Sequence, residues 1–201
     1  MKQTVNWLMN RRARSITKRL EPWLCSTLKV ADVGSGTGHN AEEWRKSLQI
    51  NVTEFDVADF HVVGSGPRLF DGTLIQERDA TFSAVTLLFI LHYSKNPMTL
   101  LQECKRITAG PLLVLQSTYI GRWGYFWLWA RELLWGRGAF VAARVAGVVR
   151  CQDCPMMPRT YFTRESLLVL FREAGLDIAE HKVRQWWGLG ISRDLFVLRQ
   201  N

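Results

Sequence analysis

The residues with the clearest chemical potential lie at 30–38, in the run Val-Ala-Asp-Val-Gly-Ser-Gly-Thr-Gly. A short apolar stretch leads there into glycines at alternate positions, Gly34, Gly36 and Gly38. Because glycine has no Cβ and tolerates positive φ, a buried strand that ends in such a loop brings its backbone close to a ligand. Asp32, two residues before the first glycine, favours a ligand that carries positive charge. The alternative interpretation is a tight strand-to-helix turn without a ligand.

The spacing of the glycines distinguishes two kinds of cofactor. The dinucleotide fingerprint G-x-G-x-x-G requires glycine at position 39, where this chain has His39. The negative charge of Asp32 would also disfavour a loop that binds only a pyrophosphate. S-adenosylmethionine, which carries a sulfonium and an ammonium group, therefore fits the sequence better than NAD does. His39 opens the following helix and is expected to shape the cofactor pocket.

A second acidic residue follows at the end of the next expected strand. Asp56 lies about one β-α-β step after the glycines. In nucleotide-binding α/β units, an acid about 20 residues after the glycine loop accepts hydrogen bonds from ribose hydroxyls. Asp56 fits this role, and Glu54 is the less suitable substitute because it falls earlier in the strand. Capping of a loop is the structural alternative for Asp56.

Together these features resemble the class I S-adenosylmethionine-dependent methyltransferases, in particular their small-molecule, methyltransferase type 11-like branch. The resemblance covers residues 28–118 and resumes from about 160 to the C-terminus. It implies that Asp71 contacts the adenine amino group, with Gly72 beside it, and that Leu88 ends the fourth strand. The cofactor-binding residues that the resemblance implies are Asp32, Gly34, Ser35, Gly36, Gly38, Asp56, Val57, Asp71, Gly72 and Leu88.

Two positions depart from the family pattern. The family's apolar-proline pair before the acidic turn is replaced by Gln76-Glu77-Arg78, and its usual Phe-Asp pair is Phe82-Ser83. Both departures bear on the contacts to adenine and leave the glycine loop intact. The missing acid at Ser83 is also the one feature that favours a catalytically silent, cofactor-binding partner subunit over an enzyme.

The order of the expected elements predicts an α/β fold, a Rossmann-like seven-stranded, mostly parallel sheet with an antiparallel edge hairpin and helices on both faces. Strands are expected near 29–33, 51–56, 68–70, 83–88, 111–116, 176–183 and 194–198. Helices are expected near 38–48, near 97–108, and from a start capped by Thr163 to a stop at Gly175. We predict a single domain over 1–201, made of an N-terminal helix (1–23), a cofactor-binding core (24–118), an insertion (119–159), and the last helix with the edge hairpin (160–201).

Residues 1–23 predict a basic amphipathic helix that ends near Pro22. They lack the uninterrupted apolar core and the cleavage site of a signal peptide. Related enzymes often place such a helix across the cofactor cleft, and a helix on a membrane surface is the rival interpretation. Its apolar members are Trp7, Leu8, Ile16 and Leu20.

The insertion at 119–159 interleaves aromatic residues with arginines. We weigh three interpretations: a lid over an apolar substrate, a patch at the membrane interface, and simple core packing. A transmembrane helix is not expected, because charges recur before an apolar run reaches the length that spans a bilayer. Tyr119, Tyr125 and Tyr161 are candidates for the wall of the acceptor pocket.

Composition and charge are those of a globular protein. Hydrophobic residues at 47% and charged residues at 22% are ordinary values, so a core can form without disulfides or metal. Four scattered cysteines favour a reducing, cytoplasmic compartment. The C-x-x-C at 151–154 lacks further zinc ligands, so no metal site is expected, and the pair is either incidental or redox-active. The net charge of +8 suits an anionic membrane surface or a nucleic acid.

These features predict a methyltransferase that moves a methyl group from S-adenosylmethionine to a small, apolar acceptor. The sulfonium is already activated, so in-line transfer chiefly demands orientation. His92 is the candidate general base for a hydroxyl acceptor, with a structural role as its alternative. His61 and His181 are expected to be surface or strand residues.

An RNA methyltransferase is a further alternative, because aromatic residues mixed with arginines can stack on bases. Against it, the exit loop Leu91-His92-Tyr93 lacks the Asn/Asp-Pro-Pro-Tyr/Phe motif with which many such enzymes orient an amino group. An NAD-dependent oxidoreductase is opposed by the glycine spacing. The expected location is the cytoplasm, with peripheral membrane attachment as the alternative.

Overall fold

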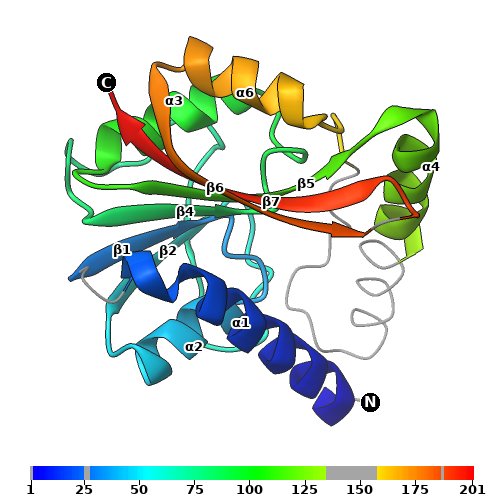
Figure 1. Cartoon of the computed structure of the whole chain (residues 1–201). Helices are drawn as coiled ribbons and strands as arrows, with labels where there is room; N and C mark the ends of the chain where they lie inside the picture. The colour runs from blue at the N-terminus through cyan, green and yellow to red at the C-terminus, as the bar shows by residue number, and fades with distance from the viewer. Residues whose placement is uncertain (1, 25–27, 135–157, 187) are drawn as a thin grey trace.

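The computed structural model describes residues 2–24, 28–134, 158–186 and 188–201, which build a seven-stranded sheet in the order β3-β2-β1-β4-β5-β7-β6 (Figure 1). Strands β1 to β5 pair in parallel, whereas β7 pairs antiparallel with both β5 and β6. This arrangement confirms the predicted Rossmann-like sheet with its edge hairpin. The strands are β1 (Lys29–Val33), β2 (Asn51–Asp56), β3 (Arg68–Leu69), β4 (Ala84–Leu88), β5 (Leu112–Tyr119), β6 (Leu176–Trp186) and β7 (Ile191–Gln200).

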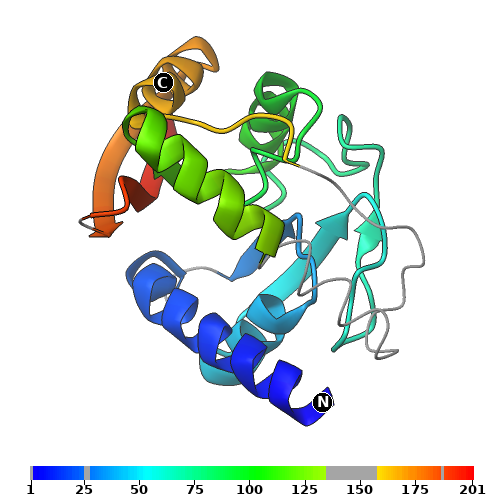
Figure 2. The same cartoon turned by 90° about the vertical axis from the view of Figure 1, so that its right-hand side faces the viewer.

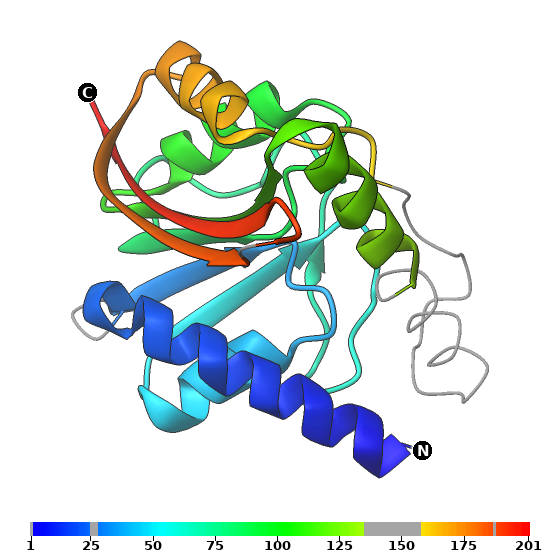
Figure 3. The same cartoon turned by 45° about the vertical axis from the view of Figure 1, so that its right-hand side comes forward.

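Helices cover both faces of this sheet (Figures 1 and 3). Helices α1 (Lys2–Leu24) and α2 (His39–Ser47) pack on one face, and α3 (Pro97–Ile107) and α6 (Arg164–Glu173) pack on the other. Helix α4 (Gly121–Arg131) begins just beyond the carboxyl end of β5. In Figure 2, α1 and α4 both lie on the side of the molecule that faces the viewer.

The strands are buried because they are apolar on both sides. All five residues of β4 are buried, as expected of a parallel strand that is covered by helices on both faces. Alternate residues of β1 enter different apolar clusters, since successive side chains of a strand point to opposite faces. Val30 packs with α1 and α2, whereas Ala31 and Val33 pack on the side of α3 and α6.

Local signals set the ends of two helices. The Asn96 side chain caps α3 by accepting a hydrogen bond from the Thr99 amide at 3.2 Å. Thr163 caps α6 in the same way, with the Ser166 amide 3.1 Å from its hydroxyl, as the sequence predicts. Gly175, with φ of 67°, follows α6 in the left-handed conformation that glycine adopts readily.

Strands β5 and β7 are longer than predicted. β5 continues to Tyr119 instead of ending near residue 116, and β7 begins at Ile191 instead of near 194. Most of the added residues are polar (Ser117, Thr118, Ser192 and Arg193), so the sequence gives them no apolar pattern. They form strand because Thr118 pairs across to Ser192, and their buried hydroxyl groups are 2.6 Å apart.

Helix α1 differs from its prediction in two respects. It continues through Pro22 to Leu24, although Pro22 has no N–H to donate to the preceding turn. The fully buried Leu24 side chain packs this last turn against the core. Ile16 and Leu20 are buried as predicted, but Trp7 and Leu8 are 58% and 47% exposed. The N-terminal half of α1 therefore lies outside the apolar core, and Figure 1 shows it extending away from the sheet.

Part of the predicted insertion lies outside the described residues, including the C-x-x-C at 151–154 and the aromatic residues Trp135 and Phe140. In the portion of the chain that the structure covers, no helix is both long enough and apolar enough to cross a membrane.

The packing of α1 predicts a large difference between two leucines. Leu20→Ala removes a fully buried side chain from the cluster beneath α1 and is expected to cost about 2–5 kcal/mol of unfolding free energy. Leu8→Ala, on the exposed part of the same helix, is expected to cost about 0.5 kcal/mol or less. Urea denaturation of both variants measures the difference, and similar costs would contradict the observed placement of α1.

Candidate functional site

The glycine loop between β1 and α2 folds back onto the end of β2. The amides of Gly34 and Ser35 donate to the carbonyl oxygen of Phe55, at 2.7 and 3.2 Å. The next amide, of Gly36, donates to the Asp56 carboxylate at 2.8 Å. Three successive N–H groups are thus satisfied by two neighbouring residues of β2, and this fixes the shape of the loop.

The first two glycines of the loop face different surroundings. At Gly34 (φ 78°) a Cβ would lie 2.5 Å from the Ile90 side chain, so only glycine allows this contact. At Gly36 (φ 58°) a Cβ would meet no heavy atom within 4 Å. The backbone at Gly36 therefore borders open space, where a ligand can approach it closely.

A cavity of about 180 Å³ lies against this loop. Gly34, Ser35, Gly36 and Leu88, which the resemblance implies as cofactor residues, line it, and so does the predicted pocket residue His39. Helix α1 supplies another wall through Met9 and Arg12. This wall agrees with the expectation that a basic helix crosses the cofactor cleft. The sequence did not indicate which side chains of the helix would face the cavity. The remaining lining residues are Thr37 and Asn40.

Asp56 is buried at the end of β2, and both of its oxygens accept backbone hydrogen bonds. One accepts from Gly36 and the other from the Val57 amide at 2.8 Å. Burial raises the pKa of Asp56, and these amide bonds oppose that rise. Glu54 instead pairs with Arg45 at 2.6 Å and lies 3.2 Å from the His61 ring. Asp56 is therefore the acid that lies at the loop.

The role of His61 in supporting the glycine loop was not predicted from the sequence. We predicted a surface or strand position, which is wrong, since His61 is fully buried behind the glycine loop. Its Nε2 lies 3.1 Å from the Ser35 hydroxyl and 3.2 Å from the Glu54 carboxylate. A Cβ on Gly38 would lie 3.0 Å from its Nδ1. No periodic pattern surrounds His61 in the sequence, so only the folded chain reveals that it supports the loop.

His181, by contrast, lies on β6 as predicted, stacked on Phe196 with ring centroids 4.3 Å apart.

Asp32 is buried beneath the loop and does not line the cavity. One carboxylate oxygen accepts a hydrogen bond from the Thr86 hydroxyl at 2.7 Å, and the other has no hydrogen-bond partner among the residues that the structure describes. Burial, and to a lesser degree the nearby carboxylates of Glu54 and Asp56, raises the pKa of Asp32 to about 7. Asp32 therefore changes its charge near neutral pH.

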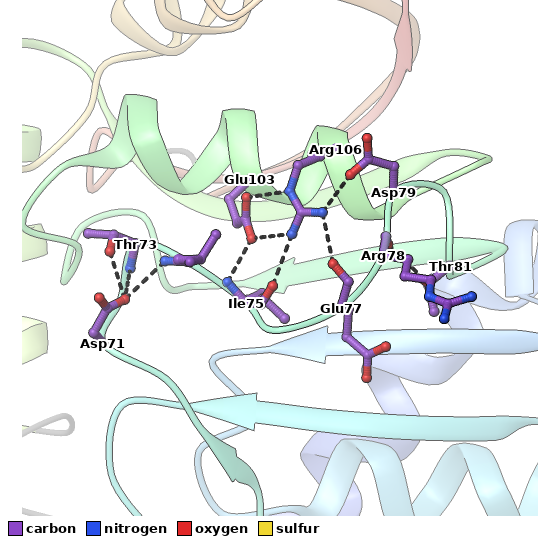
Figure 4. A network of polar contacts seen from close by, with 10 residues as sticks. Asp71, Thr73, Ile75, Glu77, Arg78, Asp79, Thr81, Glu103 and Arg106 are labelled. Carbon is purple, nitrogen blue, oxygen red and sulfur yellow. Dashed lines mark hydrogen bonds and ion pairs between the residues drawn. The ribbon is translucent and has the colours of Figure 1, made fainter.

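The segment that the resemblance assigns to adenine follows β3. Asp71 is exposed, and one of its oxygens accepts from the amides of Thr73 and Leu74, which lowers the pKa of Asp71 to about 2 (Figure 4). Gly72, with φ of 88°, lies close to the half-exposed Val57 side chain, 3.4 Å from the position of a Cβ. Val57 and Gly72 thus form adjoining surfaces next to Asp56.

The loop after Asp71 is held by polar contacts to α3 (Figure 4). Arg106 donates to the backbone carbonyls of Ile75 and Glu77 at 2.9 and 2.8 Å, and to the Asp79 carboxylate at 2.6 Å. Glu103 accepts from the Ile75 amide at 2.6 Å and also pairs with Arg106. This clamp holds the segment in which the chain lacks the family's apolar-proline pair.

His92 lies in a buried polar network near the carboxyl end of β4. The Gln116 side-chain amide donates to its Nδ1 at 2.6 Å, and its Nε2 lies 4.0 Å from the Glu132 carboxylate. Burial is the main cause that lowers the pKa of His92 to about 4. The ring is therefore neutral at physiological pH, and with Nδ1 accepting, its proton lies on Nε2.

Helix α4 presents aromatic side chains to the surroundings. Trp123, Tyr125, Phe126 and Trp129 are 40–60% exposed. These exposures do not fit simple core packing of this part of the insertion. The candidate pocket residues Tyr119 and Tyr161 both contact the Tyr125 ring edge-on, with ring centroids 5.3 and 5.4 Å away.

Comparison with known proteins identifies the family. Residues 7–181 match the model of the methyltransferase domain family, and the chain belongs to that family. No curated protein sequence matches the chain. The family and the fold confirm the prediction of a class I S-adenosylmethionine-dependent methyltransferase, and with it S-adenosylmethionine as the cofactor.

Solved structures share the fold at low sequence identity. A SAM-dependent methyltransferase from Thermotoga maritima is 16% identical, with a TM-score of 0.63, and the match covers 98% of this chain and 97% of that one. The 1,6-didemethyltoxoflavin-N1-methyltransferase of Burkholderia thailandensis, solved with S-adenosylhomocysteine, is 14% identical, with a TM-score of 0.58, over 96% of this chain and 79% of that one. The [4+2]-cyclase SpnF is also 14% identical, with a TM-score of 0.64, over 95% and 81%. Because one of these proteins is a cyclase, the fold alone does not fix the reaction.

The burial of Asp32 predicts a pH-dependent effect on stability. An acid whose pKa is raised by folding makes the native state less stable as pH rises from about 4 to about 7, with no further loss above that. Asp32→Asn removes this charge and is expected to raise Tm clearly more at pH 8 than at pH 5. Thermal unfolding at both pH values tests this, with Glu173→Gln, at an exposed position at the end of α6, as control. An equal change in Tm at both pH values would contradict the assignment.

The environment of His92 predicts that its ring does not titrate near neutral pH. Nitrogen-15 NMR of the side chain is expected to show the same neutral tautomer at pH 8 and pH 5.5, because the pKa of His92 is lowered to about 4. Protonation between these two pH values would show that the ring is far less buried than the structure indicates.

Proposed function

We propose that this methyltransferase transfers a methyl group from S-adenosylmethionine to a small, apolar acceptor. The observation that carries the proposal is the open face of Gly36, held in place by Asp56 at the end of β2 and bordered by a cavity. A loop of this shape allows a ligand to approach the backbone closely, and an acid beside it suits the ribose of a nucleoside.

Each part of the cofactor has a partner of suitable chemistry in this arrangement. The loop from Gly34 to Gly38 is proposed to hold the methionine portion, and Asp56 the ribose hydroxyls. The adjoining Val57 and Gly72 offer a surface for adenine, with Asp71 for its amino group. When ionised, Asp32 beneath the loop adds negative charge that favours a cationic ligand.

The acceptor side is proposed to be aromatic. Tyr119, Tyr125 and Tyr161 form a group of contacting rings at the start of α4, near the carboxyl end of β5. Aromatic rings bury an apolar acceptor and restrict its orientation. Since the activated methyl group needs chiefly an aligned nucleophile, such a wall contributes to catalysis by positioning.

The role of His92 follows from its chemistry. As a neutral imidazole with a lowered pKa it is a weak base. We therefore propose His92 for acceptors whose nucleophile gives up its proton easily, or as a residue that positions the acceptor through the network with Gln116 and Glu132.

We also propose that the protein works in the cytoplasm at an anionic membrane surface. The support is the exposed aromatic face of α4 together with the basic, projecting N-terminal half of α1, both on the side shown in Figure 2. Aromatic and basic side chains together suit the headgroup region of a bilayer. An apolar acceptor dissolved in the membrane would be collected there.

Asp56→Ala tests the cofactor site. Removal of a buried acceptor leaves ribose hydroxyls and the Gly36 amide without a partner, and is expected to weaken S-adenosylhomocysteine binding by about 1–3 kcal/mol, or about 5- to 150-fold in Kd. Calorimetric titration measures this. Glu173→Ala, which removes an exposed carboxylate at the end of α6, on the sheet face opposite α2, is the charge control.

If Asp56→Ala binds S-adenosylhomocysteine as tightly as the wild type, Asp56 has no ribose role. If the wild type binds S-adenosylmethionine but transfers no labelled methyl group to any apolar or amphiphilic acceptor tested, the result favours a silent cofactor-binding subunit over the proposed enzyme.

A further inference from the structure

A second, larger cleft lies beside the cofactor cavity, between α1 and the β6–β7 hairpin, which Figure 3 shows close together. Its volume is about 350 Å³. One wall is the face of α1, and the other comes from β5, β6, β7 and the residue after β4. We call it the arginine cleft; its lining is Leu8, Arg11, Arg12, Ser15, Ile16, Arg19, Phe89, Leu115, Arg184 and Arg193.

The cleft is strongly cationic. Five of its ten lining residues are arginines, and the lining includes no carboxylate. Arg184 on β6 stands directly opposite Arg193 on β7 in the antiparallel pairing. Like charges in that position repel each other and oppose folding. Burial and the surrounding arginines lower the pKa of Arg193 to about 10. The fold thus concentrates positive charge here at a cost to stability.

The carboxylates near this region have other partners. Asp194, next to Arg193 in sequence, pairs with Arg164 and with His181, each at 3.2 Å. Glu132 pairs with Arg131 and accepts a hydrogen bond from Tyr93. Neither acid lines the cleft. Glu132 also attracts Arg12, and Asp194 attracts Arg19, so these acids offset part of the positive charge without occupying the cleft.

Two of the arginines are held in place by an aromatic ring. The guanidinium carbons of Arg12 and Arg193 lie 5.1 and 5.4 Å from the centre of the Phe89 ring. Phe89 itself has a positive φ of 59°, which is uncommon for an aromatic residue. Its amide donates to the Leu115 carbonyl at 2.7 Å, which fixes the backbone there. The stacked arrangement orients the guanidinium groups before any ligand arrives.

The arginine cleft adjoins the cofactor cavity. Arg12 lines both spaces, and Phe89 directly follows Leu88, which lines the cofactor cavity. The cleft also has apolar walls at Leu8, Ile16 and Leu115. A ligand that places an anionic group among the arginines can therefore extend an apolar portion along these side chains toward the methyl donor.

We infer that the arginine cleft binds a phosphoryl group and that this group belongs to the methyl acceptor. Guanidinium groups bind phosphate oxygens in bidentate fashion, and several converging arginines suit a group with more than one negative charge. A cleft of this volume takes a small-molecule group rather than a length of polynucleotide. The statement that this group belongs to the methyl acceptor rests on the proposed function. It implies that the acceptor is a phosphorylated amphiphile, with an apolar portion and a phosphoryl group.

Calorimetric titration of the full chain with sodium pyrophosphate at low ionic strength tests whether the cleft binds a phosphoryl group. The wild type is expected to bind, and Arg184→Gln and Arg193→Gln are each expected to weaken binding at least tenfold. Arg199→Gln, an exposed arginine at the far end of β7, is the matched control and is expected to bind like the wild type. Each cleft variant relieves the repulsion between residues 184 and 193. Its circular dichroism spectrum and its thermal unfolding without pyrophosphate check that it is folded.

The same samples are titrated with S-adenosylhomocysteine, so that the two proposals fail separately. Binding of S-adenosylhomocysteine without binding of pyrophosphate overturns the cleft assignment and leaves the proposed function intact. Pyrophosphate binding that is unchanged in both cleft variants also overturns the assignment. Binding of pyrophosphate alone supports the cleft but contradicts the proposed function.

A matched pair of probes tests the link to the acceptor. With S-adenosylhomocysteine present, octyl phosphate is expected to bind at least tenfold more tightly than octanol, and this preference is expected to vanish in Arg184→Gln and Arg193→Gln. Equal binding of the two probes would contradict a phosphorylated acceptor.

Vesicles identify the source of the phosphoryl group. Association with phosphatidylglycerol vesicles but not phosphatidylcholine vesicles, lost in both cleft variants, indicates a lipid headgroup. Octyl phosphate binding without vesicle association indicates a soluble phosphorylated compound. Tighter binding of single-stranded poly(U) than of octyl phosphate, lost in the same variants, would overturn the inference in favour of RNA.

Discussion

The glycine loop turns back on the end of β2, and its first three amides donate to Phe55 and Asp56. This closure leaves the Gly36 backbone open to a ligand at the carboxyl end of the parallel strands. It does so where β1 has β2 on one side and β4 on the other, the switch point at which open α/β sheets bind ligands. His61 supports the loop from behind, and α1 closes the cavity in front of it.

Charge is divided sharply across this part of the molecule. Asp32 and Asp56 lie beneath and beside the loop, where a cofactor with a sulfonium and an ammonium group is expected. The arginines line the adjoining cleft between α1 and the β6–β7 hairpin, with Arg12 at the border of the two spaces. A cationic donor would be attracted to the cavity and an anionic acceptor to the adjoining cleft. Because the two spaces meet at Arg12, the methyl group and its nucleophile would then lie next to each other.

Local signals explain what the sequence predicts well. The glycine spacing, the acid at Asp56 and the cap at Thr163 depend on a few neighbouring residues, so each can be recognised without the fold. His61 and the pairing of Arg184 with Arg193 depend on contacts between distant segments, which no local pattern records. Polar strand ends were missed for the same reason, since Thr118 forms strand only because β7 lies beside it.

A crystal structure of the protein with S-adenosylhomocysteine tests the central claim most directly. The account predicts the homocysteine portion against Gly36, the ribose hydroxyls on the Asp56 carboxylate, and adenine between Val57 and Gly72. A nucleoside bound elsewhere, or a ribose held by a residue other than Asp56, would contradict the account of the glycine loop as the cofactor site.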